Sequence, residues 1–126
     1  DGYLRLYAQR QPAGDDRKLW MTPSLLLQKI PAPAFIAEVE LDIPENAPDM
    51  STGLVMFGED YAWIGLRHDA GSGETLLGYA SCRDARSACD ENFKTEKVFN
   101  ANTLTLRMTM AEGGSTVFGY LSCIVL

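Results

Sequence analysis

A strict alternation of apolar and polar residues in short segments constrains the fold of this chain more than any other feature. In FIAEVELDI, from Phe35 to Ile43, every second residue is apolar and the opposite side is mostly acidic. TLTLRMTM, from Thr103 to Met110, alternates in the same way. Because successive side chains of a β-strand point to opposite faces, each segment predicts a strand with one buried and one solvated face.

Further short apolar runs predict additional strands, separated by turn sequences rich in glycine and proline. These runs are Tyr3 to Ala8, Leu25 to Ile30, Leu54 to Phe57, Thr75 to Ser81, Lys97 to Phe99 and Thr116 to Leu121. The segment from Arg83 to Phe93 has sparse apolar positions, which favours an irregular loop or one short turn over a helix. Eight or nine short strands predict an all-β fold of two antiparallel sheets, a sandwich of the jelly-roll type, with a barrel as the less favoured closure.

Size and charge narrow the classes of protein. A length of 126 residues with 46% apolar content predicts a single domain spanning residues 1–126. A net charge of -6 disfavours nucleic acid as a partner, because phosphates are repelled by such a surface. No apolar stretch approaches the roughly 20 residues that span a bilayer, so we expect no membrane partner.

The three cysteines are Cys82, Cys89 and Cys123, and they lack the paired spacing of zinc or redox motifs. We interpret them as structural. Cys82 and Cys89 could close a loop in an oxidising compartment, but the sequence leaves their pairing open. Cysteine usage does not fix the compartment, and we favour an extracellular or periplasmic location.

The segment STGLVMFGEDYAWIGLRH, from Ser51 to His68, predicts two strands joined by a tight turn at Gly58, Glu59 and Asp60. In its second strand the alternation places Tyr61, Trp63 and Arg67 on one face and small or aliphatic residues on the other. If the aliphatic face covers a core, the aromatic pair and the guanidinium form a flat surface suited to a sugar ring.

Aromatic side chains combine apolar area with a polar group, so they can stack on a sugar and also bond to its hydroxyls. The candidate carbohydrate-binding residues are therefore Tyr61, Trp63, Arg67, Trp20 and Tyr79. The alternative for Tyr61 and Trp63 is packing under a loop or against a second domain.

Catalytic candidates are weak, and we predict none. Glycoside hydrolysis uses two carboxyl groups, for which Glu38, Glu40, Glu59, Asp60, Asp90 and Glu91 are available. Alternating carboxylates on a strand, such as Glu38 and Glu40, are typical of a solvated face. The single histidine, His68, lies at a strand end, and no nucleophile motif precedes it.

No metal or other cofactor is predicted. Calcium accepts carboxylate ligands, so a site could be built from loop residues, but nothing in their spacing supports one. The carboxylates considered are Asp15, Asp16, Asp49 and Asp69.

Three motifs resemble one family. They are GYLRLYA at residues 2–8, LLLQKIPAPAF at 25–35 and GLVMFGEDYAWIGL at 53–66. Their order is similar to that in the C-terminal sandwich of family 43 glycoside hydrolases of the β-xylosidase and arabinofuranosidase type. Cys82 also falls where some members have a cysteine. The resemblance covers about the first two thirds of the chain and is loose from Arg83 onward.

This resemblance implies a concanavalin A-like jelly roll with an accessory role, since catalysis in the family belongs to a separate five-bladed propeller. It implies a catalytic propeller and a xylan-type polysaccharide as partners, with Tyr61 and Trp63 as members of a recognisable motif. Family modules have further strands at both ends, so we expect the domain to be incomplete there. Open sheet edges would then favour pairing into a homo-oligomer.

Three functional hypotheses follow. The first is a non-catalytic module that binds xylan or arabinoxylan, and the second is a purely structural module that docks on the propeller. The third is a free-standing jelly-roll glycanase that uses Glu38 and Glu40, whose same-face spacing of about 7 Å is near the required range. We favour a non-enzymatic role.

Overall fold

A computed structural model of the chain describes residues 2–9, 19–43, 50–85, 89 and 91–123. Seven strands and one short 3₁₀ helix are formed within these residues. The elements are η1 (Leu19–Met21), β1 (Phe35–Asp42), β2 (Ser51–Met56), β3 (Tyr61–Asp69), β4 (Glu74–Cys82), β5 (Asn92–Val98), β6 (Thr103–Met110) and β7 (Thr116–Cys123).

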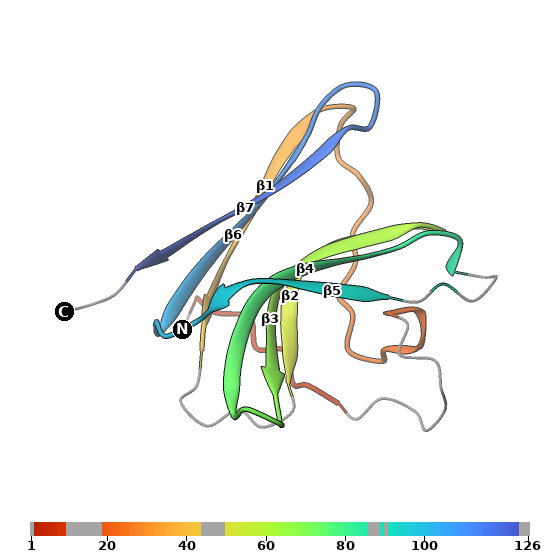
Figure 1. Cartoon of the computed structure of the whole chain (residues 1–126). Helices are drawn as coiled ribbons and strands as arrows, with labels where there is room; N and C mark the ends of the chain where they lie inside the picture. The colour runs from red at the N-terminus through yellow and green to blue at the C-terminus, as the bar shows by residue number, and fades with distance from the viewer. Residues whose placement is uncertain (1, 10–18, 44–49, 86–88, 90, 124–126) are drawn as a thin grey trace.

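The strands form two antiparallel sheets, one of three strands in the order β1-β6-β7 and one of four in the order β2-β3-β4-β5. In Figure 1 the three-stranded sheet rises away from the four-stranded sheet, so the two layers diverge. The prediction of an all-β fold with two antiparallel sheets is confirmed.

The alternation read from the sequence gives the observed register. Val39 of β1 stands opposite Leu106 of β6, and Leu41 stands opposite Leu104. In β1 the half-buried and exposed residues alternate without exception. One face of each sheet is therefore turned toward the other sheet, as half-buried strands require.

A core of aliphatic residues and one phenylalanine lies between the two sheets. β3 and β4 provide its members from the four-stranded sheet, and β6 provides those from the three-stranded sheet. Its buried residues are Ile64, Leu66, Leu77, Phe99, Leu104 and Leu106. This core fixes which face of β3 points inward.

Two predicted strands are not formed. Tyr3 to Ala8 and Leu25 to Ile30 both run outside regular secondary structure. Short apolar runs such as these are typical of strands, but a strand needs a neighbour for its backbone groups, and neither segment belongs to a sheet of the described chain. Apart from the half-buried Leu25, their large apolar side chains are consequently exposed, from 50% at Leu27 to 77% at Tyr3.

The strand predicted at Lys97 to Phe99 begins earlier, at Asn92, and ends at Val98. Its sequence, NFKTEKV, is too polar to be recognised from apolar content, because β5 is an edge strand with mostly exposed side chains. The last residues of the predicted loop from Arg83 to Phe93 therefore belong to the start of β5. Among the described residues, no helix has the length and hydrophobicity that a membrane span requires.

Candidate functional site

β3 carries most of the predicted site and is an interior strand, paired with β2 on one side and β4 on the other. Trp63 stands opposite Val55 of β2 and opposite Ala80 of β4. Ile64 and Leu66 belong to the core between the sheets, whereas Tyr61 and Trp63 belong to a second apolar cluster. The predicted assignment of side chains to two faces of β3 is confirmed.

Of the two alternatives that the sequence leaves open for Tyr61 and Trp63, a sugar-binding surface or packing under other parts of the chain, the structure shows packing. Tyr61 is 3% exposed and Trp63 is 5% exposed. Both lie in a cluster on the outer face of the four-stranded sheet, which we call the covered face. Its buried members are Tyr61, Trp63, Ala80, Cys82 and Ala85, with Leu19, Val55, Phe57, Cys89 and Phe93 packed against them. A ring buried to this degree offers no surface on which a sugar could stack.

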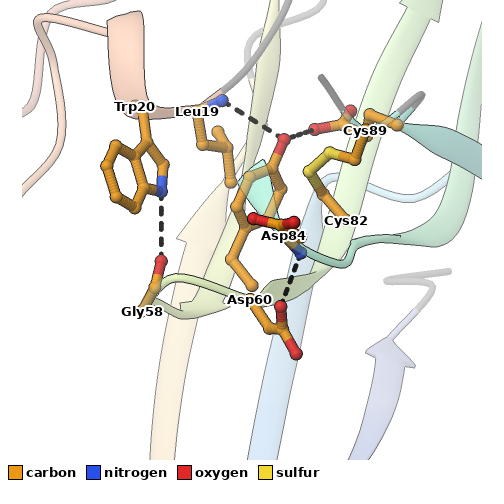
Figure 2. Close-up of a disulfide and its surroundings, with 9 residues drawn as sticks. Leu19, Trp20, Gly58, Asp60, Cys82, Asp84 and Cys89 are labelled. Atoms are coloured by element: carbon orange, nitrogen blue, oxygen red, sulfur yellow. Dashed lines mark hydrogen bonds between the residues drawn. A yellow bond between two sulfur atoms is a disulfide. The ribbon is translucent and has the colours of Figure 1, made fainter. Parts of the chain in front are cut away.

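One cover of this face comes from the segment that contains η1. The backbone N–H of Leu19 donates to the Tyr61 hydroxyl at 3.4 Å, and the Trp20 indole donates to the carbonyl of Gly58 at 3.0 Å. The Trp20 ring also contacts Phe57, with 6.0 Å between ring centroids. These contacts tie η1 to the β2–β3 turn, as Figure 2 shows for Leu19, Trp20 and Gly58.

A disulfide between Cys82 and Cys89 provides the second cover. Their Cα atoms are 5.6 Å apart, and Cys82 is buried at the end of β4 (Figure 2). The segment after β4 is fixed to the β2–β3 turn, because the Ala85 N–H donates to the Glu59 carbonyl at 3.0 Å and the Asp84 N–H donates to Asp60 Oδ1 at 2.6 Å. The pairing that the sequence left open is thus present.

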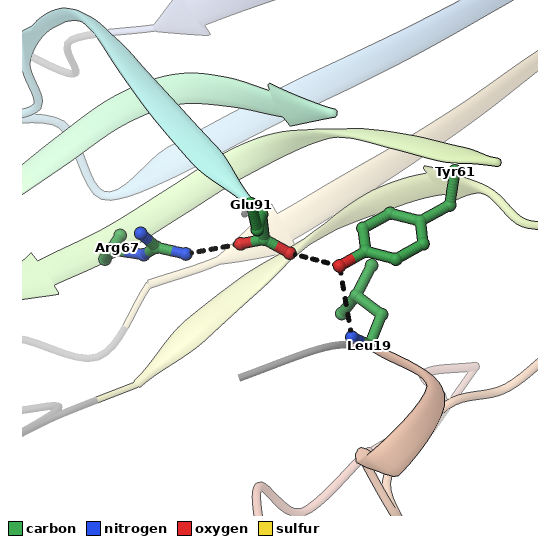
Figure 3. Close-up of polar contacts among 4 residues, drawn as sticks. All are labelled: Leu19, Tyr61, Arg67 and Glu91. Atoms are coloured by element: carbon green, nitrogen blue, oxygen red, sulfur yellow. Dashed lines mark hydrogen bonds and ion pairs between the residues drawn. The ribbon is translucent and has the colours of Figure 1, made fainter. Parts of the chain in front are cut away.

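Glu91 joins the two polar groups of the covered face. The Tyr61 hydroxyl donates to Glu91 Oε2 at 2.8 Å, and Arg67 Nη2 donates to Glu91 Oε1 at 2.8 Å (Figure 3). The Glu91 side chain is only 8% exposed, whereas that of Arg67 is 38% exposed. A buried carboxylate is costly unless it is paired and hydrogen-bonded, and here each oxygen has a donor.

Burial raises the pKa of the Tyr61 phenol well above its ordinary value, and the hydrogen bond to Glu91 raises it further. Both effects favour the neutral phenol, since ionisation would place a second negative charge beside a carboxylate. Tyr61 therefore acts as a hydrogen-bond donor across the neutral pH range.

Arg67 closes the face by lying on aromatic rings. Its guanidinium carbon is 4.4 Å from the ring centroid of Phe93 and 5.5 Å from that of Trp63. Gly65 lies between Trp63 and Arg67 on the same face of β3, so no side chain blocks the arginine from reaching back. The space above Gly65 is thus crossed by the chain's own arginine.

The Trp63 indole nitrogen is buried and has no hydrogen-bond partner. An unsatisfied buried donor of this kind costs about 1–3 kcal/mol. Trp63 therefore contributes through packing, including a ring contact with Phe93 at 5.3 Å between centroids.

The other two predicted carbohydrate-binding aromatics, Trp20 and Tyr79, do not form a common surface with Tyr61 and Trp63. Trp20 is 38% exposed at the side of the β2–β3 turn, and Tyr79 is 39% exposed on the opposite face of the sheet, where it stands opposite Ile64. From the sequence, Glu91 was only one of several carboxylates available for glycoside hydrolysis. Nothing in the spacing connects it to Tyr61 and Arg67, although a paired Cys82 and Cys89 would have brought it close to β3.

The carboxylates proposed for hydrolysis lie elsewhere. Glu38 and Glu40 are exposed on the outer face of the three-stranded sheet, and Glu38 accepts a hydrogen bond from Arg107 Nε at 2.6 Å. His68 is half-buried and stands opposite Thr75.

Asp69 serves the β3–β4 turn: its Oδ2 accepts from the Ser72 hydroxyl at 2.7 Å, and the hydrogen bonds from Ser72 lower the Asp69 pKa. Within the described ranges no group of three His, Cys, Asp or Glu residues could hold a metal ion. Asp15, Asp16, Asp49 and Asp90 lie outside the described residues.

Comparison with protein-family models gives a match over residues 1–121 to the β-xylosidase C-terminal concanavalin A-like domain. The match runs well past Arg83, where the motif resemblance becomes loose. Searches of curated proteins and of solved structures give no match. Because the matched residues span nearly the whole of a chain with two antiparallel sheets, this chain belongs to the family of β-xylosidase C-terminal concanavalin A-like domains.

Proposed function

We propose that this chain is a non-catalytic accessory module that docks on the catalytic domain of a xylan-degrading glycoside hydrolase. The observation that carries the proposal is the exposure of apolar side chains in the two segments that failed to form strands. The exposed residues are Tyr3, Leu4, Leu6 and Tyr7 in the first segment and Leu26, Leu27 and Ile30 in the second, each at least 50% exposed.

The two segments lie side by side and line a common hollow. Residues from both line a space of about 280 Å³: Arg5, Leu6, Tyr7, Gln9, Pro23, Ser24, Leu25 and Leu26. Large apolar side chains gathered at the surface of two adjacent segments are typical of interfaces. We call these two segments the docking segments. Family membership favours a catalytic domain as the partner that covers them.

Hydrogen–deuterium exchange on the chain, alone and with the catalytic domain of its parent enzyme, tests this proposal. We expect added protection in peptides 2–9 and 23–30. Leu27→Asp should prevent co-elution of the two domains, whereas Val117→Asp, at a residue 66% exposed on the three-stranded sheet, should not. Equal disruption by both variants, or protection confined to the sheets, would contradict docking through these segments. Sedimentation of the chain alone detects any dimer formed through the sheet edges.

Polysaccharide contact is a second candidate, supported by the exposed ring of Tyr79. With Tyr61 and Trp63 buried, Tyr79 is the remaining candidate of β3 and β4 whose ring is accessible. Titration with xylohexaose should then give saturable heat that a Tyr79→Ala variant loses. Unchanged binding by that variant would remove Tyr79 from the candidates and leave Trp20 and Arg67.

The disulfide supports an extracellular or periplasmic location as part of this proposal, because such bonds persist in oxidising compartments. Cys82 is 2% exposed and belongs to the covered face, so the bond also stabilises the cover. Thiol titration of the denatured protein purified from its native compartment should find Cys82 and Cys89 unreactive until a reductant is added. Reactive thiols at both positions would contradict this location.

A further inference from the structure

Two tyrosines lie on the core-facing sides of the sheets, away from the covered face. Tyr79 stands opposite Ile64 in the β3–β4 ladder, and Tyr120 stands opposite Leu106 in the β6–β7 ladder. Opposed residues of an antiparallel pair share a face, so both tyrosines share the face of core residues. Yet Tyr79 is 39% and Tyr120 41% exposed. Figure 1 shows that the two sheets diverge.

A lysine of β5 accompanies each of these rings. Lys94 stands opposite Tyr79, with its Nζ 5.9 Å from the ring centroid. The Nζ of Lys97 is 5.0 Å from the ring centroid of Tyr120 and donates to the Ser122 hydroxyl at 3.3 Å. Lys97 thereby links β5 to β7 of the other sheet. We call these five residues, Tyr79, Lys94, Lys97, Tyr120 and Ser122, the inter-sheet rim.

Within the part of the chain that the structure describes, no acidic side chain forms an ion pair with a lysine of the inter-sheet rim. Among the described residues, the ion pairs formed are Arg67 with Glu91 and Arg107 with Glu38, and neither lysine takes part in one. Lys94 and Lys97 stand opposite Tyr79 and Leu77, two positions apart on β4, which corresponds to about 7 Å along the strand. The rim therefore offers two ammonium groups, each positioned over the ring of an exposed tyrosine.

This combination selects one class of ligand. Ring faces suit the C–H surface of a sugar, and an ammonium group that lacks a counter-ion attracts a carboxylate more strongly than a neutral hydroxyl. A polyanion is disfavoured, because the chain has a net charge of -6 and repels extended negative charge. A neutral saccharide chain with isolated acidic groups satisfies both conditions.

We propose that the inter-sheet rim binds a saccharide chain that carries isolated uronic acid groups, with the sugar rings on Tyr79 and Tyr120 and the carboxylate between Lys94 and Lys97. This inference rests on the second candidate function, polysaccharide contact at Tyr79. It is independent of docking on a catalytic domain, since the docking segments lie outside the inter-sheet rim.

Calorimetric titration of the full chain with three probes tests the proposal. The probes are xylotetraose, a xylotetraose that bears one uronic acid, and an oligogalacturonate of the same length. We expect the singly acidic probe to bind about ninefold more tightly than the neutral one, since each of the two lysines contributes the equivalent of about threefold and these factors multiply. Lys94→Gln and Lys97→Gln should each weaken it about threefold, whereas Lys29→Gln, at an exposed lysine of a docking segment, should leave it unchanged.

Each other outcome overturns the inference in a recognisable way. Equal affinity for the neutral and singly acidic probes would contradict it while leaving polysaccharide contact intact. No binding of any probe would refute both the uronic acid site and polysaccharide contact at Tyr79. Tightest binding of the oligogalacturonate would contradict the inference and show a polyanion site. An equal loss of affinity in Lys29→Gln and Lys97→Gln would also contradict it, because it would show nonspecific attraction between the probe and surface lysines.

Discussion

The outer faces of the two sheets begin from similar sequence patterns and end in opposite environments. On the four-stranded sheet, the outward residues Tyr61 and Trp63 are buried in a cluster that includes Leu19 of η1, Ala85 and Cys89. On the three-stranded sheet, the outward residues Ile36, Val117 and Leu121 are 61–66% exposed. Alternation along a strand determines which side chains share a face. Whether that face meets solvent depends on segments that are distant in sequence.

The first prediction compares one residue from each outer face. Trp63→Ala should reduce the free energy of unfolding by about 3–5 kcal/mol, because it leaves a cavity in a buried cluster. Val117→Ala should change it by no more than about 0.5 kcal/mol, because its side chain already meets solvent. Urea unfolding followed by circular dichroism measures both. A loss below about 1 kcal/mol for Trp63→Ala would mean that the face is open.

The second prediction uses two glycines that also differ by face. A Cβ at Gly65 would meet the Thr52 carbonyl oxygen and Gly53 Cα, both backbone atoms of β2. Gly65→Ala should therefore cost about 2–3 kcal/mol of unfolding free energy, because β2 and β3 must separate. A Cβ at Gly119 in β7 would meet nothing within 4 Å, so Gly119→Ala should be neutral or slightly stabilising. Equal effects in thermal unfolding would contradict the close approach at Gly65.

The alternating pattern predicted the sheets and the division of β3 residues between two faces, because both follow from the two-residue period of a strand. It did not predict that Glu91 pairs with Tyr61 and Arg67, since that contact depends on how the chain turns after β4. Short apolar runs led to two predicted strands, at residues 3–8 and 25–30, that the described chain does not form, because it supplies no neighbouring strand there.

The third prediction concerns the carboxylates of the two outer faces. Glu91→Gln should lower the free energy of unfolding by about 1–2 kcal/mol, because the amide can accept a hydrogen bond through only one atom while two donors face it. Glu38→Gln removes a pair that is exposed on both sides, and its effect should stay below about 1 kcal/mol. Chemical denaturation at low and high salt distinguishes the two variants, since salt screens the exposed Arg107–Glu38 pair and should reduce only the effect of Glu38→Gln on the free energy of unfolding. A larger cost for Glu38→Gln would reverse the comparison.

The fourth prediction is a pH dependence specific to the covered face. The Tyr61 pKa is raised on folding, so the folded state holds this proton more tightly than the unfolded state. Its contribution to stability is complete below about pH 10, the ordinary tyrosine value, and is lost as the pH rises through the folded value. The loss attributable to Tyr61 should not exceed about 1.4 kcal/mol per pH unit. Tyr61→Phe should flatten the alkaline slope, and an unchanged slope would contradict burial of this phenol.

The accessibility of Trp63 tests the covered face most directly. The chain has two tryptophans, so a Trp20→Phe variant reports on Trp63 alone while retaining a ring beside Phe57. We predict blue-shifted emission and almost no quenching by iodide in the folded protein, with full quenching after denaturation. Red-shifted emission that iodide quenches in the folded protein would show an exposed indole and would restore the open aromatic platform.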